Sequence, residues 1–512
     1  MRAFTCGLLT LFVLGLAAAC SSGSGSAPAH SKPNIVVIVT DDADTASFAY
    51  TPKTKAALLD QGTFFPNFFI TLSLCCPSRV TFLRGQYAHN HRVLTSGPPD
   101  GGFTAFQQHQ LDDSTVATWL QDAGYRTALI GKYLNGYPKD SNRSYIPPGW
   151  SEWYAAVGDH AYSQFNYTLN ENGILNAYGK APADYGTDVL SRKAAGFIRR
   201  ASRANTPFFL YLTPLAPHWP AAPAPRYAHL FPGAKAPRTP AFDEEDVSDK
   251  PDYIQALPRI RPPLDELYRK RLQSMQAVDD MVANVVRELG RQGKLDNTYI
   301  FFTTDNGFML GQHRIGGGKR VPYEESTRAA MIVRGPGVPK GATLHHLTAN
   351  TDIAPTLADL TGVDTPSFVD GRSLVPLLES EPPPLAEWRH ALLLEYWPGR
   401  VDQRSLLQVP RFSGVRTQHL AYIEYATGER ELYDLRTDPD QLDNIAASAG
   451  KGTLSQLSQL VAALKICQDD DCQDAEDTAV PADVQGVLGL TKRPRDYSSN
   501  RRVIALTPHS SP

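Results

Sequence analysis

The 512-residue sequence lacks an excess of charge of either sign. Lysine and arginine together number 50, aspartate and glutamate number 53, and the formal net charge is -3. So small a net charge creates no overall field that would draw the chain to polyanions, which argues against nucleic acid as a partner. The sequence also lacks an evident internal repeat.

The chain does contain enough apolar material for a packed core. Hydrophobic residues make up 42% of it and aromatic residues 10%, and its 40 prolines indicate long ordered loops rather than disorder. Ordinary domains run to roughly 100–200 residues, although α/β enzymes can exceed that length. We therefore expect one large domain and a smaller one.

The N-terminal segment 1–19 has the layout of a secretory signal. Arg2 precedes an apolar run from Leu8 to Leu16, which is too short for a stable membrane span, and small residues follow up to Cys20. Plain cleavage after Ala19 is one outcome. We favour the lipoprotein alternative, in which Cys20 becomes a lipidated N-terminus and 20–31 a flexible tether. The expected protein is exported, either secreted or held at the cell envelope through that lipid alone.

Export also affects how the remaining cysteines are interpreted, because an oxidising compartment permits disulfides. Cys467 and Cys472 flank an acidic run at 468–471 and are predicted to form a small surface disulfide. A second cation site at this run is an alternative, but such runs are more often solvated loops. The adjacent Cys75 and Cys76 need a different explanation.

Polar residues directly follow four strand-like runs, and a helix is predicted at 267–289. The alternation predicts a large, mostly parallel sheet with helices on both faces. Ligand sites in such α/β sheets form at strand ends, so the polar residues are candidates for a site. The runs and the residues that follow them are 34–39 with Asp41 and Asp42, 127–130 with Lys132, 207–212 with His218, and 299–302 with Asp305 and Asn306.

The pattern changes near the C-terminus. Closely spaced strand candidates at 392–396, 414–416 and 421–425 predict an antiparallel meander. A proline-rich stretch precedes them, so we expect a catalytic domain at 32–384 and a smaller antiparallel α+β subdomain at 385–512. The segment 223–263, rich in Pro, Asp and Arg, is interpreted as a long surface excursion over the active site.

The run Cys75-Cys76-Pro77-Ser78-Arg79, followed by Leu83-Arg84-Gly85, resembles the signature of type I sulfatases in the alkaline phosphatase-like superfamily. In that family the first cysteine of Cys-x-Pro-Ser-Arg is oxidised to formylglycine. The resemblance thus implies a sulfuric ester hydrolase whose Cys75 is converted by a formylglycine-generating maturation enzyme. The alternative is a structural Cys-Cys pair.

The resemblance also assigns charged and metal-binding residues. Arg79, Lys132 and Lys319 match the cations that bind sulfate, for which arginine offers a planar fork and lysine a compact charge. Each lysine could instead be an ordinary surface charge. The residues that match the family's metal ligands are Asp41, Asp42, Asp305 and Asn306.

Four hard oxygen side chains, without cysteine or clustered histidine, suit calcium or magnesium better than zinc. The resemblance favours one calcium ion over magnesium. Taken singly, the pair Asp41-Asp42 could be a helix cap, and Asp305-Asn306-Gly307 could be a tight turn.

His218, in Ala216-Pro217-His218-Trp219-Pro220, matches the family histidine that contacts the ester and protonates the leaving oxygen, although a lone histidine is more often structural. One departure concerns the mechanism. Many arylsulfatases carry a histidine two places after the matching lysine, whereas this chain has Leu134. The candidates for substrate binding are His89, His91, Asn135 and His313, of which the first three could compensate for the missing histidine.

The resemblance narrows to the branch of N-acetylglucosamine-6-sulfatases and extracellular heparan 6-O-endosulfatases, on stretches that include Gly131-Lys132-Tyr133-Leu134-Asn135 and Phe165-Asn166-Tyr167-Thr168-Leu169. It implies a sulfated carbohydrate substrate of the N-acetylglucosamine-6-sulfate type. Aromatic residues between 150 and 167 could stack on sugar rings or belong to the core.

The implied mechanism uses hydrated formylglycine. One oxygen of its diol attacks sulfur while calcium lowers the pKa of that oxygen, and His218 or Lys319 protonates the departing alcohol. The second hydroxyl then expels sulfate. Two other interpretations are a phosphonate or phosphodiester hydrolase, and a non-catalytic carbohydrate-binding lipoprotein with unconverted Cys75.

Overall fold

The computed structural model describes Met1 and residues 32–138, 142–260, 263–399 and 407–480. The predicted signal segment and tether, including Cys20, lie outside these residues. The central strand of the largest sheet is β1 (Asn34–Thr40), and all seven of its residues are buried, as a continuous apolar run predicts. The other strands of this sheet are β2 (Thr63–Phe65), β4 (Arg126–Gly131), β5 (Glu152–Val157), β6 (Tyr167–Glu171), β7 (Ile174–Tyr178), β8 (Phe208–Thr213), β9 (Thr298–Thr304), β10 (Met331–Arg334) and β11 (Ala342–Thr343).

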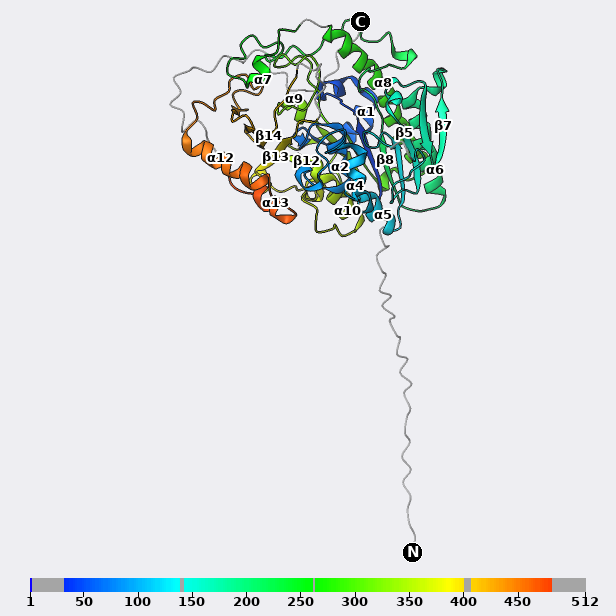
Figure 1. Ribbon diagram of the computed structural model, residues 1–512. Helices are drawn as coiled ribbons and strands as arrows, with labels where there is room; N and C mark the ends of the chain where they lie inside the picture. The colour runs from blue at the N-terminus through cyan, green and yellow to red at the C-terminus, as the bar shows by residue number, and fades with distance from the viewer. Residues whose placement is uncertain (2–31, 139–141, 261–262, 400–406, 481–512) are drawn as a thin grey trace. The chain divides into compact units, whose positions relative to one another are not determined.

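These ten strands lie in the order β11-β2-β10-β9-β1-β8-β4-β5-β6-β7. In Figure 1, β8, β5 and β7 of this sheet follow one another from the middle of the view toward its right side. The middle of the sheet, from β9 through β1, β8 and β4 to β5, is parallel throughout. Antiparallel pairs add β10 on one side and β6 and β7 on the other. The four runs predicted from the sequence are β1, β4, β8 and β9, so the mostly parallel sheet is confirmed.

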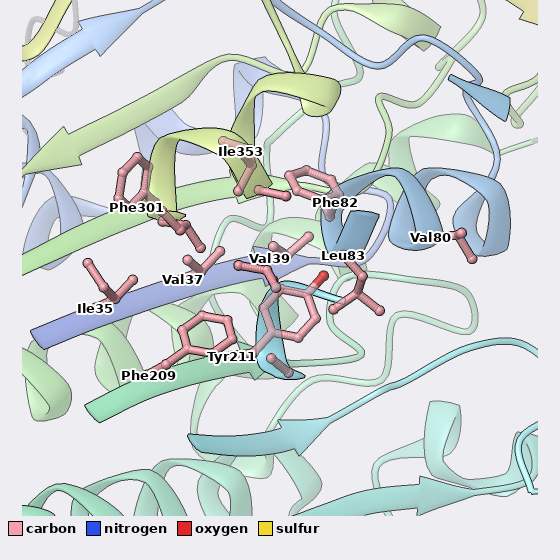
Figure 2. Packing of buried hydrophobic residues seen from close by; sticks show 14 of the residues in the cluster. Ile35, Val37, Val39, Val80, Phe82, Leu83, Phe209, Tyr211, Phe301 and Ile353 are labelled. Atoms are coloured by element: carbon pink, nitrogen blue, oxygen red, sulfur yellow. The ribbon is translucent and has the colours of Figure 1, made fainter. Parts of the chain in front are cut away.

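Helices cover both faces of this sheet because successive side chains of a strand point to opposite sides. Val36 and Ile38 share one core with the long helices α6 (Gly186–Arg203) and α8 (Leu264–Arg291). On the other face, Val37 and Val39 belong to the core formed with α2 (Cys75–Arg84) and α10 (Ile353–Thr361), as Figure 2 shows. Burying each such side chain contributes roughly 1.5–3 kcal/mol.

Shorter elements complete this part of the chain. The helices are α1 (Pro52–Ala57), α3 (Ala88–His91), α4 (Gly102–Gln108), α5 (Val116–Asp122), α7 (Asp252–Gln255), α9 (Glu324–Thr327) and α11 (Val375–Leu378). A small parallel pair joins β3 (Phe68–Phe69) to β12 (Thr348–Ala349). No helix among the described residues combines the length and the apolar character that a bilayer crossing requires.

The predicted C-terminal meander is confirmed and has a fourth strand. It consists of β13 (Ala391–Tyr396), β14 (Phe412–Thr417), β15 (Leu420–Tyr425) and β16 (Arg430–Asp434), all antiparallel. One face packs against α12 (Lys451–Leu464) and α13 (Asp470–Glu476). The predicted disulfide joins Cys467, which lies between these helices, to Cys472 within α13, and both cysteines are buried rather than on the surface. The exact boundary at 384/385 stays a prediction.

The described part of the segment 223–263, residues 223–260 and 263, is largely irregular, but it is packed rather than simply laid on the surface. Ala241 and Ile254 are buried. Its backbone bonds to the 311–313 segment, since Asp243 N donates to Gly311 O at 2.8 Å and His313 N donates to Ala241 O at 2.8 Å. The excursion therefore braces the loop that leads to Lys319.

Candidate active site

The site forms where β1 and β9 end side by side. Thr40 lies opposite Thr304, so Asp41 and Asp305 leave neighbouring parallel strands at the same edge of the sheet. Asp305 N donates to Thr40 O at 3.0 Å, and Asp42 N donates to the Oδ1 of Asp305 at 3.1 Å. Asp42 has a φ of 66°, a left-handed conformation that is uncommon outside glycine and is found at functional sites.

Cys75 is the first residue of α2 and lies against these carboxylates. Its Sγ is 3.5 Å from the Oδ1 of Asp41, 3.7 Å from the Oδ1 of Asp42 and 2.7 Å from the Nζ of Lys319. Burial raises the pKa of the Cys75 thiol, and the neighbouring lysines only partly offset this effect. Cys76 belongs to the apolar core behind the sheet, and both thiols are free, so the two cysteines do not form a bonded pair.

Three cations surround the buried carboxylates. Arg79, one turn after Cys75 on α2, directs its Nε to the Oδ2 of Asp305 at 2.9 Å. Lys132, directly after β4, lies with its Nζ 2.7 Å from the Oδ2 of Asp41. The Nζ of Lys319 donates a hydrogen bond to the Oδ1 of Asp42. The structure therefore brings together all three of the predicted sulfate-binding cations.

The charges of this cluster perturb its carboxyl groups. Burial by itself would raise the pKa of Asp41, but Lys132, His218 and Arg79 hold it well below its usual range. Burial has the same direction at Asp42, where Lys319 and His218 lower the pKa to about 2. At Asp305, burial and the charge of Asp41 raise the pKa.

Two of the predicted metal ligands, Asp41 and Asp42, belong to a group that also includes Cys75 and His218, and ligand atoms of these four residues all lie within 4.8 Å of one another. The other two predicted ligands contact Asp42, since Asp305 accepts from its backbone nitrogen. Asn306 donates from Nδ2 to the Oδ1 of Asp42 at 2.7 Å, and its own buried Oδ1 has no hydrogen-bond partner among the described residues. An unsatisfied carbonyl oxygen beside carboxylates is a donor set that calcium and magnesium prefer.

His218 lies at the more open side of the cluster, with its side chain 24% exposed. Its Nε2 is 3.6 Å from the Oδ2 of Asp42, and its Nδ1 is 2.8 Å from the backbone oxygen of Trp219. The ring of Tyr162 lies against the imidazole, with 4.3 Å between the ring centres, and the Nζ of Lys132 is 5.3 Å from the centre of the same Tyr162 ring.

Two residues of this site were missed by sequence reasoning. Tyr162 belongs to the aromatic stretch 150–167, whose members Trp150 and Trp153 are core residues instead. Arg271, on the buried side of α8, bonds the backbone oxygen of Asp42 and lies 3.1 Å from the Oδ2 of Asp44. An arginine on the apolar face of an amphipathic helix was the signal that could have revealed it.

The side chains of His89 and His91, on α3, form hydrogen bonds with residues outside this site. His91 is buried between Thr81 and the backbone of Val93, and His89 pairs with Glu395 at 2.9 Å. No hydrogen bond or ion pair within the described ranges links either histidine to the cluster around Cys75. Their direct contacts therefore do not support the predicted substrate-binding role.

The other two candidates are similarly placed. His313 contacts Glu244 at 2.6 Å and stacks on Tyr323, and the backbone of Asn135 accepts from Phe103 N at 2.8 Å. Leu134 packs into the core, which explains why an apolar residue is tolerated at that position. No contact described for His313 or Asn135 involves Cys75 or the buried carboxylates, and their role in substrate binding stays a prediction.

Comparisons with known proteins point to the same family as the motif at Cys75. A family model described as sulfatase matches residues 33–363, and one described as N-sulphoglucosamine sulphohydrolase, C-terminal, matches residues 311–467. The chain is 34% identical to an arylsulfatase of Volvox carteri, with 91% of this chain and 78% of that protein covered. It is 33% identical to the N-acetylglucosamine-6-sulfatase of Homo sapiens, with 91% of this chain and 90% of that protein covered.

The chain is also similar to a protein of known structure. That protein was solved in complex with its substrate D-glucosamine-2-N,6-O-disulfate, and it superposes on this chain with a TM-score of 0.72 at 26% identity. The match covers 87% of this chain and 99% of that one.

Proposed function

The chain belongs to the sulfatase family and is a sulfuric ester hydrolase, and on that premise we propose that it cleaves sulfate from a sulfated carbohydrate through formylglycine made from Cys75. The proposed substrate is of the N-acetylglucosamine-6-sulfate type. The observation that carries the proposal is the position of Cys75, whose Sγ lies within 3.7 Å of both Asp41 and Asp42 and within 2.7 Å of Lys319.

Formylglycine, when present, supplies a hydrated aldehyde whose one hydroxyl is the nucleophile and whose other hydroxyl allows sulfate to be released. The Cys75 thiol stands in for that group here. Lys319 is in hydrogen-bond range of position 75 and can hold or accept a proton there. Lys132 and Arg79 lie beside Asp41 and are the proposed source of positive charge for the negative charge that develops on the transferring sulfate.

We propose Asp41, Asp42, Asp305 and Asn306 as the ligands of a single calcium ion, with magnesium as the less favoured ion. A bound divalent cation supplies Lewis-acid polarisation of the ester and lowers the pKa of a coordinated hydroxyl. The imidazole of His218 is 24% exposed, more than the lysines and carboxylates around it, so it is the proposed donor of a proton to the departing alcohol.

The substrate class rests on the named relatives. The human relative is an N-acetylglucosamine-6-sulfatase, and the superposed structure holds a glucosamine carrying a 6-O-sulfate. Export rests on the N-terminal sequence, with lipidation at Cys20 favoured over plain secretion. The remaining proposed partner is the maturation enzyme that oxidises Cys75.

The first test is mass spectrometry of the tryptic peptide that contains Cys75, from protein made in a host with the maturation machinery. We expect a mass loss that matches thiol-to-aldehyde conversion, together with release of sulfate from N-acetylglucosamine-6-sulfate. Cys75→Ser should abolish activity, whereas Cys76→Ala, which changes a core residue, is the matched control and should keep both conversion and activity.

Two outcomes would contradict the proposal. Unmodified Cys75, in a host that converts a known substrate of the machinery, would favour the carbohydrate-binding lipoprotein. Hydrolysis of an aryl phosphonate ester in preference to an aryl sulfate, by converted protein, would favour the phosphonate or phosphodiester hydrolase.

A further inference from the structure

Tyr162 occupies a position that the proposed chemistry does not yet use. It lies in a short 3-10 helix, Asp159–Ser163, between β5 and β6, and its ring is partly buried. One neighbour of the ring is the imidazole of His218, with 4.3 Å between ring centres and 32° between planes. Another is the Nζ of Lys132, 5.3 Å from the ring centre. The side chain therefore contacts two of the proposed functional groups at once.

An ordinary packing role does not account for these contacts. Tyr162 does pack against the core beside α6 and α8, but its ring also meets a partly exposed imidazole and a buried ammonium. Burial raises the pKa of its phenol, and the ionisable groups that act on that phenol are Lys132, Asp41 and Cys75, of which Lys132 opposes the rise. These are residues at the centre of the candidate active site.

His218 has few other restraints. Its Nδ1 bonds the backbone oxygen of the next residue, and its Nε2 is 3.6 Å from the Oδ2 of Asp42, too far for a hydrogen bond of good geometry. A proton donor must be held within hydrogen-bond range of the leaving oxygen in a defined orientation. The Tyr162 ring, 4.3 Å from the imidazole and tilted 32° from its plane, packs directly against this side chain.

We propose that Tyr162 is a positioning residue for sulfate ester hydrolysis, whose ring holds His218 in the orientation that protonates the departing alcohol. This inference rests on the proposed function, because it assigns Tyr162 a role through the proposed proton donor. The ring is the working part, so phenylalanine should serve at this position and alanine should not.

The test compares two leaving groups. A nitrophenolate departs without a proton, whereas a sugar alkoxide requires one, so the loss of a positioned acid affects only the second. For Tyr162→Ala we expect kcat/KM to fall about 100-fold on N-acetylglucosamine-6-sulfate and less than about 10-fold on 4-nitrophenyl sulfate, within the usual contribution of general acid catalysis. Tyr162→Phe should stay close to wild type on both esters. Tyr178→Ala removes the ring of a tyrosine in β7 that stacks on Tyr167, and it controls for general destabilisation.

A double-mutant cycle shows whether Tyr162 acts through His218. On the sugar sulfate, the variant carrying both Tyr162→Ala and His218→Ala should be no slower than His218→Ala alone. Additive losses, or equal losses of Tyr162→Ala on both esters, would overturn the inference while leaving the sulfatase function intact. A converted wild-type protein that hydrolyses neither ester would instead overturn the proposed function.

Discussion

Replacing Arg79 with alanine should destabilise the folded protein by about 3–5 kcal/mol, the usual loss when one partner of a buried ion pair is removed. The Arg79 side chain is 1% exposed, and the carboxylates of Asp305 and Asp41 are fully buried. Two guanidinium nitrogens lie 2.9 Å from the Oδ2 of Asp305, and a third donates to the backbone oxygen of Lys132 at 3.2 Å. Asp41 retains Lys132 at 2.7 Å, so we expect the lower end of the range.

The assay is urea unfolding followed by tryptophan fluorescence, in the presence of a chelator so that no bound cation compensates for the missing charge. The chain offers a matched control in Arg226, which pairs with Asp188 at only 2.6 Å but is 43% exposed. Because solvent screens this pair, Arg226→Ala should lower the free energy of unfolding by about 0–1 kcal/mol. Arg79→Lys keeps the charge without the planar fork and should lie between the two.

The burial of an ion pair, not the distance between its charged atoms, sets the magnitude of the loss in stability. Equal losses for Arg79→Ala and Arg226→Ala would refute it. So would a loss below about 1 kcal/mol for Arg79→Ala, since that is the value of a solvent-exposed pair.

Three further predictions concern the metal and the interior. After metal has been removed with a chelator, adding calcium at 100 times its dissociation constant should raise the stability of the wild-type protein by about 2.7 kcal/mol in differential scanning fluorimetry. Asn306→Ala should reduce this gain in stability. Gly307→Ala should weaken calcium binding in the same titration, because the added Cβ would lie 2.1 Å from the backbone oxygen of Glu325 and displace the ligand loop. Burial raises the pKa of Glu431 above its ordinary value of 4.5, so the folded state holds this proton more tightly than the unfolded state. The protonated carboxyl of Glu431 should contribute its full stability below pH 4.5, and this contribution should be lost as the pH rises through the raised pKa. Urea unfolding of Glu431→Gln over the same pH range should therefore show a smaller fall in the free energy of unfolding than wild type.

The sequence determined much of the local structure. The runs that became β1 and β9 are short, apolar and followed at once by polar residues, and such periodicity is a property of neighbouring residues in the chain. The helix predicted at 267–289 is α8 (Leu264–Arg291), a few residues longer at each end because helix termini are weakly encoded. The fourth strand of the meander, β16, was not predicted as a strand and became one by pairing with β15.

The motif at Cys75 was equally local, because its residues lie within one helix and its resemblance to the sulfatase signature needs no tertiary information. Only the folded chain decides which distant groups meet there. The backbone of Asp42 meets Asp305 across 263 residues of sequence because β1 pairs with β9, and parallel pairing of this kind leaves no trace in the spacing of either strand. The same packing brings Tyr162 against His218, and it pairs His89 with Glu395 rather than with the residues around Cys75. A side chain's partners depend on the order of the strands and the layering of the helices, and these are set by the burial of the whole core rather than by any one segment.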